Sequence, residues 1–149
     1  MPLEQARDVV AHARSFHREL GGFYQKLEHQ VHRERVQLLL EYLVEHEKRM
    51  ADQMDALEES LPRSVLDTWF KNAPDAPEPI SESDSRIRPD MTPSEVICLA
   101  LDLDERMLRV FKQVALQSPV QEVREAFLAL YQEGRKEREK LVLDMFEPE

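Results

Sequence analysis

Four ionisable side chains occupy positions that a helical pattern reserves for apolar residues: His17, Glu47, Asp104 and Glu137. One imidazole and three carboxylates form a ligand set that zinc, iron or manganese accepts. Charged groups are rarely buried unless they pair with one another or coordinate a metal. Two interpretations stay open. Either the four residues hold a metal ion, or they pair among themselves as a remnant of such a site and bind no metal.

Glu47 belongs to the stretch YLVEHEKRM, whose apolar stripe advances in steps of three and four residues. Residues at this spacing share one face of a helix, so Glu47 is predicted to face inward with Leu43. A register error of one residue would turn His46 and Glu133 inward instead. Those two residues, with the histidine and the aspartate above, form an alternative ligand set. We place Glu47 inward because it lies at the centre of the stripe.

Long amphipathic patterns must position these side chains. The third pattern begins with TPSE, where Thr92 is a predicted N-cap, Pro93 takes the first helical position and Glu95 closes a capping box. The fourth begins with SPVQ in the same way. A proline-rich connection over 61–92 precedes the third pattern and carries a predicted short helical turn at 64–70. The predicted helices cover residues 3–29, 32–60, 93–116 and 119–146.

The two halves of the chain repeat one pattern at a shift of 87 residues. Under this shift, apolar stripe residues of the first two helices fall on apolar residues of the last two. The polar positions also correspond: His17 with Asp104, Glu47 with Gly134, and Met50 with Glu137. Two short-looped helical hairpins joined by a long crossover have the topology of ferritin-like bundles. The predicted fold class is therefore all-α, with the whole chain 1–149 forming one four-helix bundle.

The spacing of these residues resembles the ferritin-like superfamily, and within it the rubrerythrin type. That family carries Glu followed seven residues later by Tyr or Phe on its first and third helices, and Glu-x-x-His on its second and fourth. The resemblance covers roughly residues 10–57 and 95–145. The corresponding pairs here are His17 with Tyr24, Asp104 with Phe111, Glu47 with Met50, and Gly134 with Glu137. Neither Glu-x-x-His motif is intact.

The resemblance implies a metal–carboxylate centre at His17, Glu47, Asp104 and Glu137 that holds iron, manganese or zinc, with a redox or stress role. The alternative is a metal-free bundle that acts as a structural or protein-interaction module. No Ser-His-Asp arrangement, phosphate-cradling loop or nucleotide fingerprint occurs in the sequence, and no enzymatic activity is assigned.

Composition limits the classes of partner. The 149 residues carry a formal net charge of -10, which gives the chain no electrostatic reason to bind nucleic acid or an anionic membrane. The single cysteine, Cys98, excludes an internal disulfide and a cysteine-based zinc cluster, and its apolar surroundings predict a core position. No signal peptide or membrane-spanning run is evident, so we expect a cytoplasmic protein. A homodimer or a helical protein partner is compatible with this composition.

Overall fold

Apolar residues at helical spacing are buried along every long helix of the computed structural model, which describes residues 3–146. Apart from one isolated backbone bridge between Gln5 and Trp69, the described residues contain no β-structure. The predicted all-α class is confirmed. The helices are α1 (Ala6–Glu28), α2 (Glu34–Ser60), α3 (Arg63–Leu66), α4 (Pro93–Gln117) and α5 (Gln121–Phe146).

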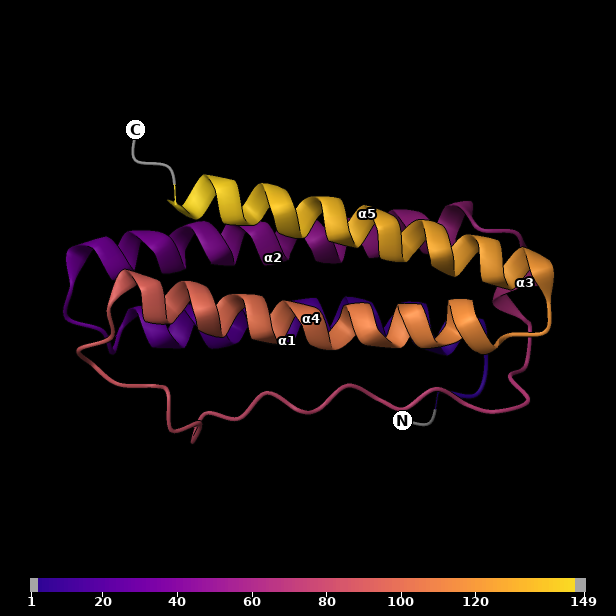
Figure 1. The fold of residues 1–149 in the computed structure, drawn as a ribbon, viewed down its shortest axis with the longest axis horizontal. Helices are drawn as coiled ribbons and strands as arrows, with labels where there is room; N and C mark the ends of the chain where they lie inside the picture. The colour runs from indigo at the N-terminus through magenta and orange to yellow at the C-terminus, as the bar shows by residue number, and fades with distance from the viewer. Residues whose placement is uncertain (1–2, 147–149) are drawn as a thin grey trace.

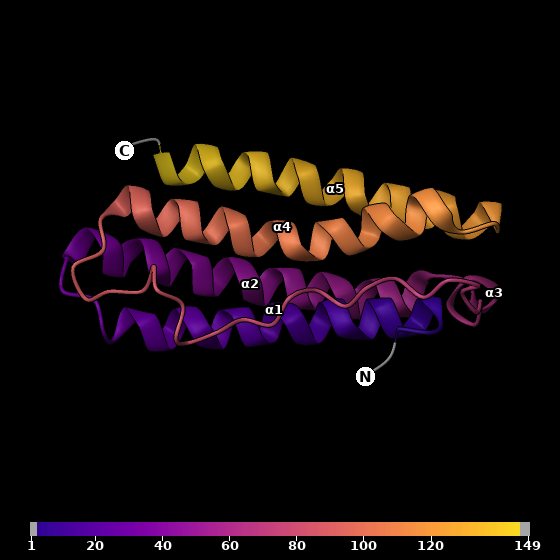
Figure 2. The ribbon, with the colours of Figure 1, turned by 60° about the horizontal axis from the view of Figure 1, so that its bottom comes forward.

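The four long helices form two antiparallel hairpins that lie side by side (Figures 1 and 2). Helices α1 and α2 make the first hairpin, and α4 and α5 make the second. The crossover between them runs back along the length of the bundle, so that α4 begins at the end where α1 turns into α2 (Figure 1). This is the predicted topology. Helices α2 and α4 also contact each other, so the two hairpins meet along these helices.

Capping chemistry fixes the start of α4 where the sequence predicts it. The Thr92 hydroxyl accepts a hydrogen bond from the Glu95 backbone N–H at 3.2 Å, and the Thr92 N–H donates to the Glu95 carboxylate at 3.0 Å. Pro93 is the first helical residue. This reciprocal arrangement satisfies two backbone donors that would otherwise lack a partner.

Other predicted helix ends need correction. The last helix begins at Gln121 rather than at residue 119, because the Ser118 N–H still donates to the Val114 carbonyl and closes α4. The first helix begins at Ala6 rather than at residue 3. The short turn predicted over 64–70 is a helix only over Arg63–Leu66, after which the chain is extended.

Backbone pairing between two extended segments explains the late start of α1. The Phe70 N–H donates to the Glu4 carbonyl at 2.8 Å, and the Ala6 N–H donates to the Thr68 carbonyl at 3.0 Å. These bonds hold Leu3–Gln5 in an extended conformation beside residues 68–70. Hydrogen bonds between segments far apart in sequence are invisible to a helical periodicity, which explains why the pattern extended the helix too far.

Two further features bear on the sequence predictions. Cys98 is exposed, so the expectation that it fills the core is wrong; its neighbours Ile97 and Leu99 carry the buried face of α4 instead. Over residues 3–146, no helix combines the length and the apolar character needed to cross a membrane.

Candidate metal site

The centre of the first hairpin contains a buried ion pair between α1 and α2. His17 Nδ1 lies 2.6 Å from Glu47 Oε1, and the two residues are 3% and 2% exposed. Burial by itself lowers the pKa of His17, but the charge of Glu47, the hydrogen bond to it and the charge of Asp104 outweigh burial and raise that pKa. The raised pKa favours the imidazolium form of His17, in which Nδ1–H donates to the Glu47 carboxylate.

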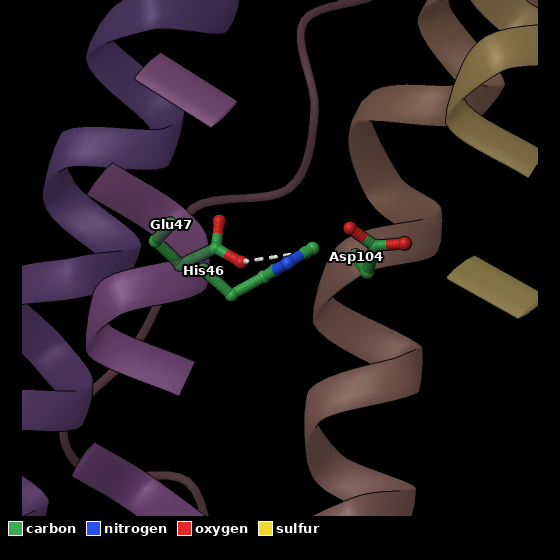
Figure 3. A group of neighbouring side chains, drawn as sticks. All are labelled: His46, Glu47 and Asp104. Atoms are coloured by element: carbon green, nitrogen blue, oxygen red, sulfur yellow. Dashed lines mark ion pairs between the residues drawn. The ribbon is translucent and has the colours of Figure 1, made fainter. Parts of the chain in front are cut away.

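His46 lies beside this pair and also points into the bundle. It is 3% exposed, its ring stacks on Tyr42, and its Nε2 is 3.8 Å from Glu47 Oε2. Figure 3 shows the imidazole extending from α2 toward Asp104 of α4. Burial lowers the pKa of His46, and the positive charges of Arg49 and His17 act in the same direction, against Glu47 and Glu137. A neutral imidazole with a free nitrogen lone pair is the form that binds metals.

Asp104 brings the second hairpin into the cluster. It projects from α4, is 7% exposed, and lies across the bundle from Glu47. Burial raises the pKa of Asp104 to about 7, with a further contribution from the charge of Glu47, while His17 and Arg138 act in the opposite direction. Near neutral pH this carboxyl therefore keeps its proton for part of the time, unless a cation replaces it.

Three of these residues form a compact group (Figure 3). His46, Glu47 and Asp104 each offer one ligand atom, and these three atoms all lie within 4.8 Å of one another. A single metal ion bound by two oxygens and one nitrogen needs ligand atoms at about 2.0–2.2 Å from it. His17 contacts Oε1 of Glu47, whereas His46 faces Oε2, so the His17 contact orients that carboxylate.

The predicted residues of α5 lie differently. Glu137 is only partly buried and lies outside the compact group, although its charge acts on His46. Glu133, which belonged to the alternative ligand set, is exposed and lies 4.0 Å from Lys136, so the structure does not support that alternative at this position. Gly134 is buried against α4, where an added Cβ would overlap Leu108 Cδ2.

The burial predicted for His17, Glu47 and Asp104 is confirmed. His46, which entered only as an alternative to Glu47, is buried together with it. Neighbouring residues of a helix point about 100° apart. Both can face inward here because α2 has α1 on one side and α4 on another. In the sequence, the only indication that α2 contacts two helices at this level is the adjacent pair of ionisable residues His46 and Glu47.

Comparison with known proteins identifies the fold. No protein-family model matches the sequence, and no curated protein matches it at a significant level. A crystal structure from Thermotoga maritima, described as a ferritin-like diiron-carboxylate protein, superposes with a TM-score of 0.61 and covers 95% of each chain at 15% sequence identity. Together with the helical hairpins and the crossover described above, this similarity shows that the chain has the ferritin-like fold.

Proposed function

We propose that this protein binds one divalent transition-metal ion through His46, Glu47 and Asp104. The observation that carries the proposal is the convergence of these three buried side chains, with ligand atoms within 4.8 Å of one another and contributions from two different helices. Burying two carboxylates together is unfavourable unless a cation or protons neutralise them. A metal ion would supply that charge.

The donor set supports a metal that accepts both imidazole and carboxylate. Zinc, iron(II) and manganese(II) satisfy this requirement, and the general order of affinities places zinc above the other two. Bound iron or manganese would supply redox chemistry, and bound zinc a Lewis acid. His17 would act on the ligand Glu47 by donating a hydrogen bond to it, the kind of outer interaction that orients metal ligands. Glu137 is the candidate for an additional ligand from α5.

The same side chains fit one ion better than two. In a symmetric two-ion site, the second half of the chain would repeat the ligands of the first. Here Gly134 stands at the position equivalent to Glu47, and Leu108 fills the space that a side chain at 134 would need. Met50 takes the place of the histidine in the Glu-x-x-His pattern of α2. A two-ion centre would therefore lack a bridging carboxylate and a nitrogen ligand.

The test is a titration of chelator-treated, tag-free protein with zinc or manganese, followed by calorimetry and by elemental analysis after desalting. We expect a stoichiometry of one ion per chain. His46→Ala should weaken binding by at least about tenfold, because it removes the one uncharged ligand. The matched control is His32→Ala, which removes an exposed histidine in the loop between α1 and α2 and should leave binding unchanged. Two ions per chain, or equal affinity in both variants, would contradict the proposal.

A metal-free structural bundle is the second candidate. It is favoured by the His17–Glu47 contact of 2.6 Å, which already neutralises one carboxylate without any metal. In that case, zinc and manganese would not bind to the chelator-treated protein at micromolar concentrations, and the cluster would serve only to pair its own charges.

A further inference from the structure

A cavity of about 180 Å³ opens between α2, α4 and α5, next to the candidate metal site. Its inner end is formed by the buried residues His17 and Asp104, and its mouth carries the exposed Glu133 and the partly buried Glu137. Between these polar ends the walls are apolar. They are formed mainly by Met50, Met54, Met107, Leu108, Phe111 and Leu130.

Packing of the second hairpin explains why this space exists. Gly134 has no side chain, and Leu108 of α4 lies against it so closely that a Cβ there would overlap the leucine. Gly134 also lines the cavity and adds no side chain to it. The space between α2 and α5 therefore stays open beside Met50.

The size and lining of the cavity define what it can hold. A dry apolar cavity of about 150 Å³ is large enough to bind benzene. Methionine side chains adapt their shape to a guest and make favourable contacts with aromatic rings. A molecule with one aromatic ring, or a short aliphatic chain of similar size, therefore fits the walls.

The charges of the cavity select the polar group of that molecule. Three carboxylates line it, those of Asp104, Glu133 and Glu137, and none of the residues that line it is lysine or arginine. Lys136, which is not part of the lining, lies 4.0 Å from Glu133. The one cationic side chain, His17, is already paired with Glu47. A carboxylate or phosphate ligand would meet like charges at the mouth, whereas an ammonium group would meet opposite ones.

We propose that the cavity is a binding site for a small primary amine with an apolar body of about one ring. The apolar body packs against the methionines and Phe111, and the ammonium group is held at the mouth by Glu133 and Glu137. Binding needs no metal ion, so this proposal goes beyond the metal site and stands or falls independently of it.

Methyl NMR of methionine tests the proposal at its walls. Protein labelled with ¹³C at the methionine methyl groups, and treated with chelator, is titrated with benzylamine, benzyl alcohol and benzoate. Met50, Met54 and Met107 should shift with benzylamine, whereas Met91 and Met145, which are buried outside the cavity, should not. Benzylamine should bind roughly three- to tenfold more tightly than benzyl alcohol, as expected for one exposed and one partly buried carboxylate. Benzoate should bind most weakly.

Two variants locate the site. Glu133→Gln with Glu137→Gln should remove the preference for the amine over the alcohol and leave alcohol binding unchanged. Leu130→Trp should fill the cavity and abolish binding of all three probes while the protein stays folded; Leu57→Phe at the same wall serves if the tryptophan variant unfolds. Benzoate binding as tight as that of benzylamine, or an absence of shifts at the three cavity methionines, would overturn the proposal. Repeating the titration with zinc present separates the two sites, since cavity binding without metal binding would refute only the metal proposal.

Discussion

Helices α1 and α2 of the first hairpin bury ten and nine residues, whereas the two helices of the second hairpin differ, with eleven buried residues in α4 and five in α5. Of the described residues, four histidine, aspartate or glutamate side chains are buried, and the first hairpin holds three of them, His17, His46 and Glu47. The second hairpin contributes Asp104 from α4 and only partly buried acidic groups from α5. The two hairpins share one helical pattern but differ in what that pattern encloses.

The two hairpins therefore differ in what their interiors can accommodate. A tightly packed hairpin can keep charged groups in a fixed geometry, because their desolvation is offset by a short contact such as His17–Glu47. The second hairpin borders a cavity beside this cluster. Gly134 of α5 lies against Leu108 of α4 there and adds no side chain to the cavity. Substitutions in the first hairpin should therefore act mainly through charge, and those in the second through space.

Glu47→Ala should produce the largest effect. The substitution leaves His17 buried without its partner, and removing one member of a buried ion pair costs about 3–5 kcal/mol. Urea unfolding of the metal-free protein measures this loss. The matched control is Glu45→Ala, an exposed glutamate on the same helix, which should change the free energy of unfolding by no more than about 0.5 kcal/mol. A loss below about 1 kcal/mol for Glu47→Ala would show that the cluster is not energetically coupled.

The pH dependence of stability should follow from the shifted groups. The folded pKa of Asp104, about 7, lies above its ordinary value of 3.8, and that of His17 lies above 6.5, so the native protein holds more protons at both sites. Their contribution to stability is lost as pH rises through these folded values. The pKa of His46 is lowered, so its contribution has the opposite sign and is lost as pH falls below 6.5.

In thermal melts of the chelator-treated protein, the contribution of Asp104 to the melting temperature should be lost as pH rises from about 3.8 to about 7, and that of His17 as pH rises above 6.5. Asp104→Asn should weaken this loss, because the amide does not titrate. Added zinc should raise the melting temperature more at pH 8 than at pH 6, since protons compete with the metal for its ligands. A melting temperature that rises steadily over this range without metal would mean that His17 and Asp104 are solvated.

The smallest expected effect compares one substitution in the two hairpins. Gly22→Ala in α1 places a methyl group in open space and should stabilise the protein by about 1 kcal/mol through helix propensity. Gly134→Ala in α5 gains the same propensity but forces Leu108 from its place, and overpacking of this kind costs about 1–3 kcal/mol. We expect a net loss of about 1 kcal/mol at position 134. Parallel thermal melts measure both, and equal signs would show that the second hairpin has room to relax.

Much of the fold could be predicted because its signals are local. Apolar residues at steps of three and four define the long helices, the Thr92–Glu95 capping box fixes the start of α4, and prolines mark the crossover. The repeat at a shift of 87 residues indicated two hairpins. These features depend on neighbours within one or two helical turns, so a single sequence contains them.

Long-range contacts decided the rest. The start of α1 depends on hydrogen bonds between residues 4–6 and 68–70, which no helical pattern reveals. The exposure of Cys98 likewise depends on which face of α4 the other helices cover.

For the candidate site, the sequence by itself determined which ionisable residues interrupt the apolar stripes, and so placed His17, Glu47 and Asp104 in the interior. The tertiary structure decided that His46 joins them and that Glu137 stays near the surface. A periodic pattern gives the direction of a side chain around its own helix axis, but burial also depends on how many neighbouring helices surround that axis. Helix α2 lies against both α1 and α4, whereas α5 packs mainly against α4, and this difference in neighbours is set only when the two hairpins come together.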